Sequence, residues 1–426
     1  MLTAIVGTNW GDEGKGRMVD LLSRDYDVVV RYQGGNNAGH TVINDKGKFV
    51  LNLLPSGILR ETTVNIMGNG MVIDLEHLNK EIRALTEKGV KITPRNLKIS
   101  DKAVICLPYH KLLDILEEDR LGAAKQGSTR RGIAPVYADK YMRKALRVGD
   151  LLDGEETLRR KVDALVQWKN LTVQDGYKSE AVHTEDIMDW LGAYGGPIRD
   201  HVCDTTLYLS GAIAAGKRIM FEAQLGALRD IDFGIYPYTS SSSTIASYAP
   251  IGSGVPFARL DEVIGIMKAY SSAVGGGPFT VEMSGGEAEA LREAGGEYGA
   301  ATGRPRRVGA FDMVASRYGT KMQGATCIAL TKLDVLSFME EIPVCVAYEV
   351  DGERTDEFPT GERLNRAKPI YETVPGFKRD ISGCRKPEDL PKEALDYIRL
   401  IEEGVGCPIK YVSVGAERDQ YVVMDQ

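Results

Sequence analysis

A glycine-rich loop near the start of the chain carries charged residues that could do chemistry. The apolar run 2–7 leads into residues 8–16, Thr-Asn-Trp-Gly-Asp-Glu-Gly-Lys-Gly, and apolar residues then recur at helical spacing. This order predicts a strand, a loop and a helix. Backbone N–H groups at such a turn can surround an anion, and Lys15 adds a positive charge. The alternative is an ordinary βα turn, since glycines are common there.

Two carboxylates in this loop favour catalysis over simple phosphate binding. The loop is not a Walker A motif, because six residues separate Gly7 from Gly14 and Gly16 stands where Ser or Thr would hold magnesium. Asp12 and Glu13 would repel bound phosphates unless a divalent cation or a proton transfer required them. We therefore expect a catalytic loop.

Four further polar loops follow apolar segments and suit anionic or polar ligands. They are 33–41, which contains His40; 122–135, with Ser, Thr and Arg together; 239–243, rich in hydroxyls; and 295–309, with three arginines. Arginine can hold a carboxylate or phosphate with two hydrogen bonds. Each loop also has a plain interpretation: a hydrogen-bonded histidine, a solvated tip, a flexible linker or an exposed basic loop.

A Lys-x-Asp sequence follows the predicted strand 326–330. The carboxylate of Asp334 could accept both N1–H and the exocyclic amine of guanine, a pair of donors that adenine lacks, while the stem of Lys332 packs over the ring. The motif alone is weak because it occurs by chance. Its place after a strand, together with a phosphate-type loop, favours a guanine nucleotide.

Composition narrows the function class. The chain has 426 residues, 53 basic and 60 acidic, and a net charge of −7, without a long basic run. A nucleic acid is therefore an improbable main partner. No apolar segment is long enough to span a membrane, and we expect a cytoplasmic protein. The six cysteines show no C-x-x-C spacing, so we expect neither a zinc site nor disulfides, only buried small apolar residues.

Alternating strands and helices favour one large α/β body. We expect a helix over 260–273, a strand over 279–283 and an irregular charged segment over 351–387. The other expected strands are 27–31, 64–68, 218–222, 326–330, 343–349 and 409–414, and the other expected helices are 75–88, 109–120, 155–170, 184–194, 202–215 and 391–403.

Four motifs, in their order and spacing, closely resemble the adenylosuccinate synthetases. They are Gly-Asp-Glu-Gly-Lys-Gly at 11–16, Gly-Gly-Asn-Asn-Ala-Gly-His-Thr at 34–41, Thr-Gly-Arg-Pro-Arg-Arg at 302–307 and Thr-Lys-Leu-Asp-Val-Leu at 331–336. The resemblance implies an α/β fold with one large, mainly parallel twisted sheet flanked by helices, a nucleotide site like that of P-loop GTPases, and small subdomains. It implies a single domain over 1–426, with a helical subdomain inserted at about 100–200.

The resemblance also implies the activity. A ligase of this family joins IMP to L-aspartate, forming adenylosuccinate through a 6-phosphoryl-IMP intermediate, while GTP is hydrolysed to GDP and phosphate. Asp12 would take the N1 proton of IMP, His40 would act as general acid on the phosphate side, and Lys15 would neutralise the transferring group. Mg²⁺ would be held by Asp12 and the carbonyl of Gly39. The enzyme would be a homodimer in which Arg143 reaches the partner's site.

The same resemblance assigns binding residues to each substrate. The residues implied for GTP are Gly11, Asp12, Glu13, Gly14, Lys15, Gly16, Arg17, Gly39, His40, Thr41, Arg306, Lys332, Leu333, Asp334, Ser413, Val414 and Gly415. Those implied for IMP are Asp12, Glu13, Gly14, Lys15, Asn37, Ala38, Gly39, His40, Thr129, Arg143, Gln224, Ser240 and Arg304. Those implied for aspartate are Ala300, Ala301, Thr302, Gly303, Arg304, Pro305 and Arg306.

Departures from the family pattern keep two alternatives open. Gln224 comes one place early after the strand, Ala301 replaces a threonine, and Ser128-Thr129-Arg130-Arg131 replaces Thr-Thr-Gly-Arg. Because these changes lie on the IMP and aspartate side, a related GTP-dependent ligase could use another purine nucleotide or amine. A GTPase switch is the third hypothesis, but a switch needs no base beside a second substrate.

Overall fold

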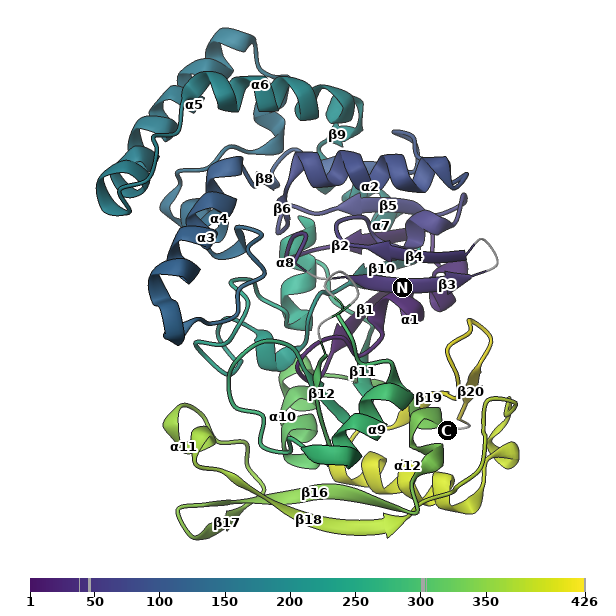
Figure 1. The fold of residues 1–426 in the computed structure, drawn as a ribbon. Coiled ribbons are helices and arrows are strands. Elements are labelled where there is room, and N and C mark those ends of the chain that lie inside the picture. Colours follow the sequence, from purple (N-terminus) through teal and green to yellow (C-terminus); the bar gives the residue numbers. More distant parts are fainter. Residues whose placement is uncertain (38, 45–46, 300–302, 304, 425–426) are drawn as a thin grey trace.

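A ten-stranded sheet forms the centre of the molecule in the computed structural model, which describes residues 1–37, 39–44, 47–299, 303 and 305–424. The strand order is β20-β19-β15-β11-β1-β10-β2-β5-β7-β9. All neighbours run parallel except β19 and β20, which are antiparallel. The mainly parallel sheet flanked by helices (Figure 1) confirms the expected fold class.

The strands of the large sheet are short and mostly buried. Buried on both faces, they lack the alternating pattern of a half-exposed strand, as is typical of parallel sheets. The strands in this sheet are β1 (Leu2–Gly7), β2 (Val28–Arg31), β5 (Val64–Met67), β7 (Leu97–Ser100), β9 (Val202–Cys203), β10 (Ile219–Glu222), β11 (Glu262–Lys268), β15 (Cys327–Thr331), β19 (Ile409–Ser413) and β20 (Tyr421–Val423).

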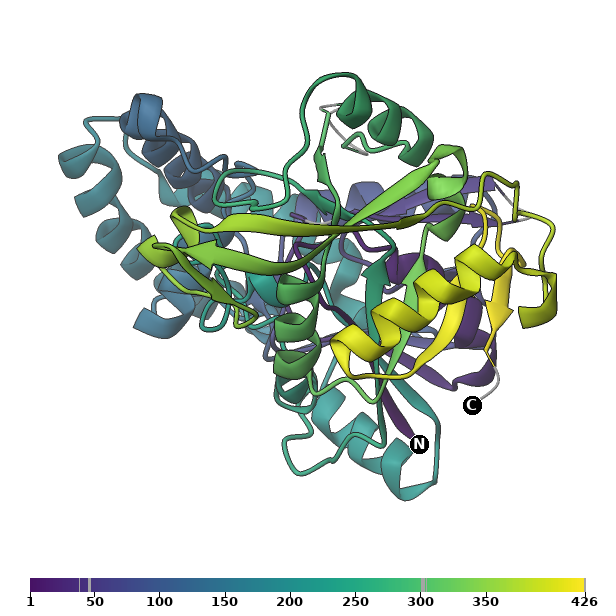
Figure 2. The same cartoon turned by 90° about the horizontal axis from the view of Figure 1, so that it is seen from below.

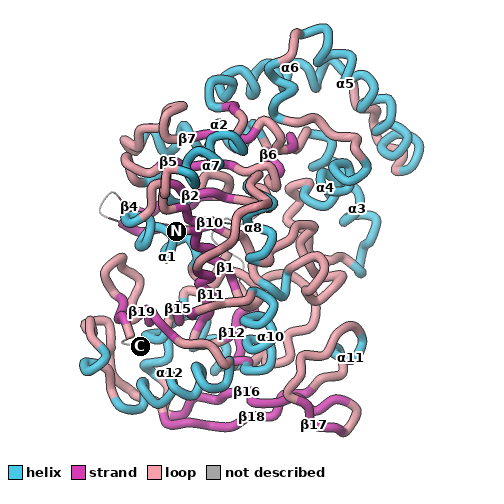
Figure 3. Tube along the Cα trace, turned by 180° about the vertical axis from the view of Figure 1, so that it is seen from behind, coloured by secondary structure: helices cyan, strands magenta, loops and turns pink. Residues whose placement is uncertain are grey.

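Helices cover the sheet and extend beyond one end of it. The α-helices are α1 (Lys15–Leu22), α2 (Leu75–Glu87), α3 (Pro108–Leu121), α4 (Ile133–Met142), α5 (Glu155–Asn170), α6 (Thr184–Gly195), α7 (Thr205–Ala214), α8 (Ala249–Ser253), α9 (Gly285–Gly295), α10 (Met313–Gln323), α11 (Glu362–Asn365) and α12 (Lys392–Val405). Seen from behind, the strands run through the middle of the molecule, and α3 to α6 lie together at one side of it (Figure 3).

Smaller sheets complete the fold. They contain β3 (His40–Asn44), β4 (Gly47–Leu51), β6 (Val72–Ile73), β8 (Val104–Ile105), β12 (Ser271–Ala273), β13 (Arg307–Gly309), β14 (Phe311–Asp312), β16 (Glu341–Val350), β17 (Glu353–Thr355) and β18 (Lys368–Pro375). The long ribbon of β16 and β18 crosses the molecule at the end opposite α5 and α6 (Figures 1 and 2).

Three expectations about local structure were wrong. The segment 260–273 is not a helix but strands β11 and β12, and β11 lies between β1 and β15. A short apolar run buried on both faces has no period that separates a helix from a strand, which explains the error. No strand is formed over 279–283, whereas 351–387, expected to be irregular, contains β17 and β18, paired with β16.

The loops after β1, β10 and β15 lie at the same edge of the sheet, because these strands are parallel and close in the strand order. In open α/β sheets, ligands bind outside the carboxyl ends of the strands. All six cysteines are free, and all but Cys203 are buried, as expected. Within the described ranges, no helix has the length and apolar character needed to cross a membrane.

Candidate active site

The loop between β1 and α1 is braced from within by Glu13. One carboxylate oxygen accepts the backbone N–H groups of Asn9 (3.2 Å) and Gly11 (2.8 Å), and the other lies 2.5 Å from Nζ of Lys15. Glu13 and Lys15 are buried. Gly11, Asp12 and Gly14 have φ values of 98°, 59° and 101°, the left-handed region that suits glycine. The loop therefore has a fixed shape. Of these three residues, Asp12 alone is not a glycine.

His40 lies directly over the start of α1. A Cβ at position 16 would be 2.6 Å from Cβ of His40, so Gly16 makes room for the histidine. Nδ1 of His40 is 2.5 Å from the carboxylate of Glu222, which also accepts the N–H (2.8 Å) and hydroxyl (2.6 Å) of Ser56. Burial, and then the charge of Arg31, lower the pKa of His40. Glu222 thus fixes the orientation of a buried ring.

An ion pair connects Asp12 to residues 302–307, which we call the arginine loop. Its carboxylate is 2.9 Å from the guanidinium of Arg306, and its side chain is 30% exposed, so a ligand could reach it. Arg306 is also 2.8 Å from Glu297, a residue with no exposed surface. Glu297 in turn contacts Lys332, at 3.0 Å. The structure thus brings together Asp12, Arg306 and Lys332, which the sequence places far apart.

The end of β15 contacts the loop between β1 and α1, which we call the phosphate loop after the ligand that its sequence predicts. The hydroxyl of Thr331 donates to the carbonyl of Glu13 (2.6 Å), and Leu333 is buried behind it. One carboxylate oxygen of Asp334, Oδ1, is buried and has no hydrogen bond within the described part of the chain. Burial raises the pKa of this carboxyl. A buried acceptor without a donor is costly, which indicates a ligand that donates hydrogen bonds here.

Arg17 holds the C-terminal loop against α1. Its guanidinium donates to the hydroxyl of Ser413 (2.6 Å) and to the carbonyl of Gly415 (2.5 Å), with further bonds to the carbonyls of Glu417 and Gln420. The N–H of Val414 donates to the carbonyl of Gln420 (3.0 Å). Arg17, Ser413 and Gly415, implied for GTP, are therefore in mutual contact.

A second buried acceptor lies on the side expected to bind IMP. Gln224 donates to the carbonyl of Gly35 (3.0 Å), whereas its Oε1 is buried without a hydrogen bond in the described ranges. Asn37 accepts the N–H of Gly35 (3.2 Å), and the hydroxyls of Ser240 and Ser242 are 3.1 Å apart. Gly39 is half-buried before His40, which begins β3, and Thr41 follows in the same strand.

Not all of the expected residues are brought into contact. Thr129 and Arg143 are exposed, and among the described residues neither side chain forms a hydrogen bond or an ion pair. The backbone N–H of Arg143 donates to the carbonyl of Lys140 (3.1 Å). In the arginine loop, Gly303 has φ 64° and Pro305 forms a bridge with Tyr298. Five expected site residues lie outside the described residues: Ala38, Ala300, Ala301, Thr302 and Arg304.

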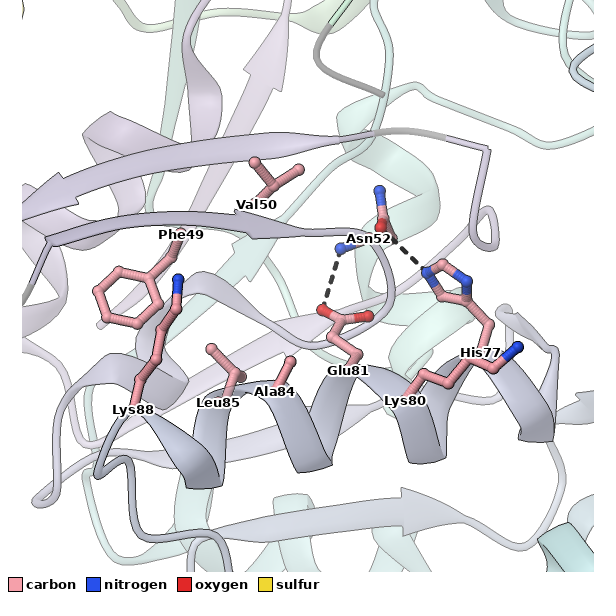
Figure 4. Close-up of a pocket in the computed structure, with 9 residues that line it drawn as sticks. All are labelled: Phe49, Val50, Asn52, His77, Lys80, Glu81, Ala84, Leu85 and Lys88. Atoms are coloured by element: carbon pink, nitrogen blue, oxygen red, sulfur yellow. Dashed lines mark hydrogen bonds between the residues drawn. The ribbon is translucent and has the colours of Figure 1, made fainter. Parts of the chain in front are cut away.

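A pocket lies elsewhere, between β4 and α2 (Figure 4). It has a volume of about 240 Å³, and the residues that line it are Phe49, Val50, Asn52, His77, Lys80, Glu81, Ala84, Leu85 and Lys88. His77 is hydrogen-bonded to Asn52 (3.0 Å), and Glu81 accepts the N–H of Asn52 (3.0 Å). None of the expected site residues lines this pocket, so we do not place the active site there.

Sequence reasoning missed Glu222 and Glu297, the two buried carboxylates that hold His40 and Arg306. Each gave a weak signal. Glu222 ends the buried strand β10, and Glu297 stands in a glycine-rich stretch immediately before the arginine loop. A carboxylate at the carboxyl end of a parallel strand is well placed to orient a catalytic group, and this signal could have found Glu222.

Comparisons with known proteins agree with these features. The family model described as adenylosuccinate synthetase matches residues 4–422. The adenylosuccinate synthetase of Streptococcus gordonii is 45% identical over 422 residues, covering 99% of this chain and 97% of the relative, and that of Nostoc punctiforme is 46% identical, covering 99% and 94%. The structure of fully ligated adenylosuccinate synthetase from Plasmodium falciparum has a TM-score of 0.93 and 35% identity, covering 99% of each chain. The chain therefore belongs to the adenylosuccinate synthetase family and is a GTP-dependent ligase of purine biosynthesis that joins IMP and L-aspartate to form adenylosuccinate.

Proposed function

We propose that Asp12 is the base of the reaction. It would remove the N1 proton of IMP, so that O6 attacks the γ-phosphate of GTP and forms 6-phosphoryl-IMP. The amine of aspartate would then attack C6 and displace phosphate. The observation that carries this assignment is the position of Asp12: a partly exposed carboxylate on the phosphate loop, in the left-handed region and held by Arg306 at 2.9 Å. A fixed carboxylate beside the reacting phosphate suits proton removal.

His40 and Lys15 would act on the phosphate side of the same loop. With Nδ1–H donated to Glu222, Nε2 of His40 is the nitrogen left to face the phosphate, and the ring would act as general acid in its protonated form, which the Glu222 carboxylate stabilises. Lys15, at the first position of α1, would stabilise the transferring phosphoryl group. Such a transition state needs charge stabilisation more than covalent help.

The donor set fits Mg²⁺. The Asp12 carboxylate and the Gly39 carbonyl are hard oxygen donors, and Mg²⁺ in nucleotide sites usually takes one or two carboxylates together with substrate phosphates. The described residues contain no group of three or more His, Cys, Asp or Glu that could hold a metal ion. When bound, the ion would neutralise phosphate charge.

The guanine base would be read by Asp334, whose buried Oδ1 lacks a donor, with Lys332, Ser413 and Gly415 around it. On the other side, the unpaired Oε1 of Gln224 and the hydroxyl of Ser240 would contact IMP. Gly303 to Arg306, with Thr302, would hold the carboxylates of aspartate, since neighbouring arginines can bind one dicarboxylate.

A partner subunit would complete the IMP site. Tyr141 and Met142, next to Arg143, are 72% and 50% exposed, which is unusual for large apolar side chains and typical of an interface. We propose a homodimer in which Arg143 reaches the IMP phosphate of the partner, opposite Thr129. We further propose that residues 1–426 act as one domain, with the helical part at about 100–200 inserted, and that the enzyme is cytoplasmic.

Positional isotope exchange tests the role of Asp12. GTP labelled with ¹⁸O in the β,γ-bridge is incubated with Mg²⁺ and IMP but without aspartate, and bridge-to-nonbridge scrambling reports reversible phosphoryl transfer. The wild-type protein should scramble the label, and Asp12→Asn should not, although it still binds GTP. The exposed Asp25→Asn serves as control. Scrambling at the wild-type rate in Asp12→Asn would remove Asp12 from this step.

A further inference from the structure

The carboxylate of Glu297 is a meeting point for side chains from separate parts of the site. Its Oε1 lies 2.8 Å from Nζ of Lys268, 3.0 Å from Nζ of Lys332 and 2.5 Å from the hydroxyl of Tyr270. Its Oε2 lies 2.8 Å from the guanidinium of Arg306. Glu297 itself has no exposed surface. One buried carboxylate therefore receives four donors.

The charges around Glu297 do not balance. Lys268, Lys332 and Arg306 contribute three positive charges, while Glu297 and Asp12 supply two negative ones. Burial acts to raise the pKa of Glu297, but the three cations outweigh it and hold that pKa far below the usual range. Burial lowers the pKa of Lys268 to about 8. Because the shared carboxylate is buried, each cation is sensitive to the others through it.

The three cations come from different elements with different expected tasks. Lys268 ends the central strand β11 and is also hydrogen-bonded to Ser272 (2.6 Å), so it is a fixed anchor. Lys332 follows β15, two residues before Asp334 on the guanine side. Arg306 stands at the end of the arginine loop and contacts Asp12. Glu297 thus lies between the guanine side and the aspartate side.

We propose that Glu297 is a positioning residue that couples guanine recognition to aspartate binding through Lys332 and Arg306. This inference rests on the roles proposed above for those two residues. When Lys332 is removed, Glu297 loses one of the cations that fix its carboxylate, so it no longer holds Arg306 in the position that aspartate needs. Arg306 is then less available to the carboxylates of aspartate. A change at Lys332 therefore alters the affinity for aspartate as well as that for GTP.

The main test is a double-mutant cycle between Lys332→Met and Glu297→Gln, with steady-state kinetics for GTP, IMP and aspartate. Each single variant should raise the KM for GTP and the KM for aspartate by ~10-fold, as expected for a lost charge-assisted contact, while the KM for IMP stays within about threefold. In the Glu297→Gln background, Lys332→Met should have no further effect on the KM for aspartate. This non-additivity is the signature of coupling.

Controls separate coupling from damage to the fold. Glu293→Gln removes a charge four residues away that also accepts a tyrosine hydroxyl, from Tyr298, but is exposed. It should leave every KM unchanged. If Glu297→Gln does not fold by thermal melting, Tyr270→Phe removes one donor from the same carboxylate. It should raise the KM values for GTP and aspartate together by roughly fivefold, the worth of one hydrogen bond.

The outcomes distinguish this inference from the proposed function. If Lys332→Met leaves the KM for GTP unchanged, the proposed guanine role of Lys332 is wrong. If it raises the KM for GTP but not that for aspartate, or if the two changes act multiplicatively in the double variant, Glu297 does not couple the sites. A purely structural role would lower the melting temperature without the paired change in the two KM values.

Discussion

Glu222 and Glu297 are both fully buried carboxylates beside the phosphate loop, yet they hold their neighbours in different ways. Glu222 contacts His40, the proposed general acid, and within the described chain its other hydrogen-bond partner is Ser56, a neutral residue. Glu297 serves three cations from three elements. Glu222 therefore fixes the orientation of one side chain, while the single charge of Glu297 is shared among three cations with separate proposed roles.

The difference follows from the position of each residue in the sheet. Glu222 ends strand β10 between β1 and β2, where the backbone on both sides is fixed by parallel pairing. Glu297 follows helix α9 and precedes the arginine loop, outside the sheet. A carboxylate on a rigid strand can orient a base or an acid precisely. A carboxylate outside the sheet can instead connect loops that bind different substrates.

The largest effect should come from Asp12, the base proposed above. Asp12→Asn keeps the size of the side chain but removes the base, so kcat should fall by ~10²–10⁴, as is typical for loss of general base catalysis. GTP binding should largely remain, measured by fluorescence of a guanine nucleotide analogue. Near-normal turnover in this variant would show that Asp12 is not the base of the reaction.

Glu222→Gln tests the rigid side of the comparison. The amide retains the bulk and can still accept from Ser56, but it lacks the charge that fixes the ring of His40. We expect kcat to fall by about 10–10², the order of loss for a misplaced catalytic group, with the KM for GTP, IMP and aspartate little changed. If the KM for aspartate rose as it is expected to rise for Glu297→Gln, the two carboxylates would not differ in function.

The family and its activity could be predicted from the sequence because the motifs that carry the resemblance are local. The loop 8–16 carries its glycines, carboxylates and lysine within nine residues, and the Lys-x-Asp motif follows a strand directly. The parallel sheet also followed from alternating elements, although β11 was mistaken for a helix because its apolar run is buried on both faces.

The contacts that connect these motifs could not be predicted. Glu297 is 29 residues from Lys268 and 35 from Lys332, and no spacing rule relates residues that meet only through strand order. The pairing of Glu222 with His40 likewise spans 182 residues. Long-range contacts between buried charges depend on the tertiary fold, whereas motifs depend on neighbours along the chain.

Asp334→Asn should have a smaller effect, confined to the guanine side. If Oδ1 of Asp334 accepts hydrogen bonds from guanine, the amide should weaken GTP binding and raise the KM for GTP by ~10-fold. It should also improve the use of XTP relative to GTP, because the C2 carbonyl of xanthine suits an amide donor. The exposed Asp396→Asn on α12 is the control. An unchanged KM for GTP would mean that Asp334 does not read the base.

Asp312 is a buried carboxylate that forms no ion pair with any residue the structure describes, and its replacement should leave catalysis unchanged. It accepts the N–H of Ala315 at the start of α10 (3.0 Å) and the hydroxyl of Tyr348 (2.5 Å). Burial raises its pKa from 3.8 to about 6. Asp312→Asn preserves an acceptor for the helix and a polar group facing Tyr348, so it should fold and retain wild-type kcat.

The effect of Asp312 should be visible only in stability, and its sign follows from the raised pKa. Between pH 4 and 6 the unfolded carboxyl loses its proton while the folded one keeps it, so the free energy of unfolding falls as pH rises. The total loss in the free energy of unfolding is on the order of 1–3 kcal/mol, since each unit of pKa shift corresponds to about 1.4 kcal/mol. Urea unfolding at pH 4.5 and pH 7 should therefore show Asp312→Asn gaining stability relative to the wild type as pH rises. If the difference in unfolding free energy between Asp312→Asn and the wild type did not change with pH, the pKa of Asp312 would not be raised in the folded protein. Asp312 would then be ionised over this pH range, as Glu297 is among its cations.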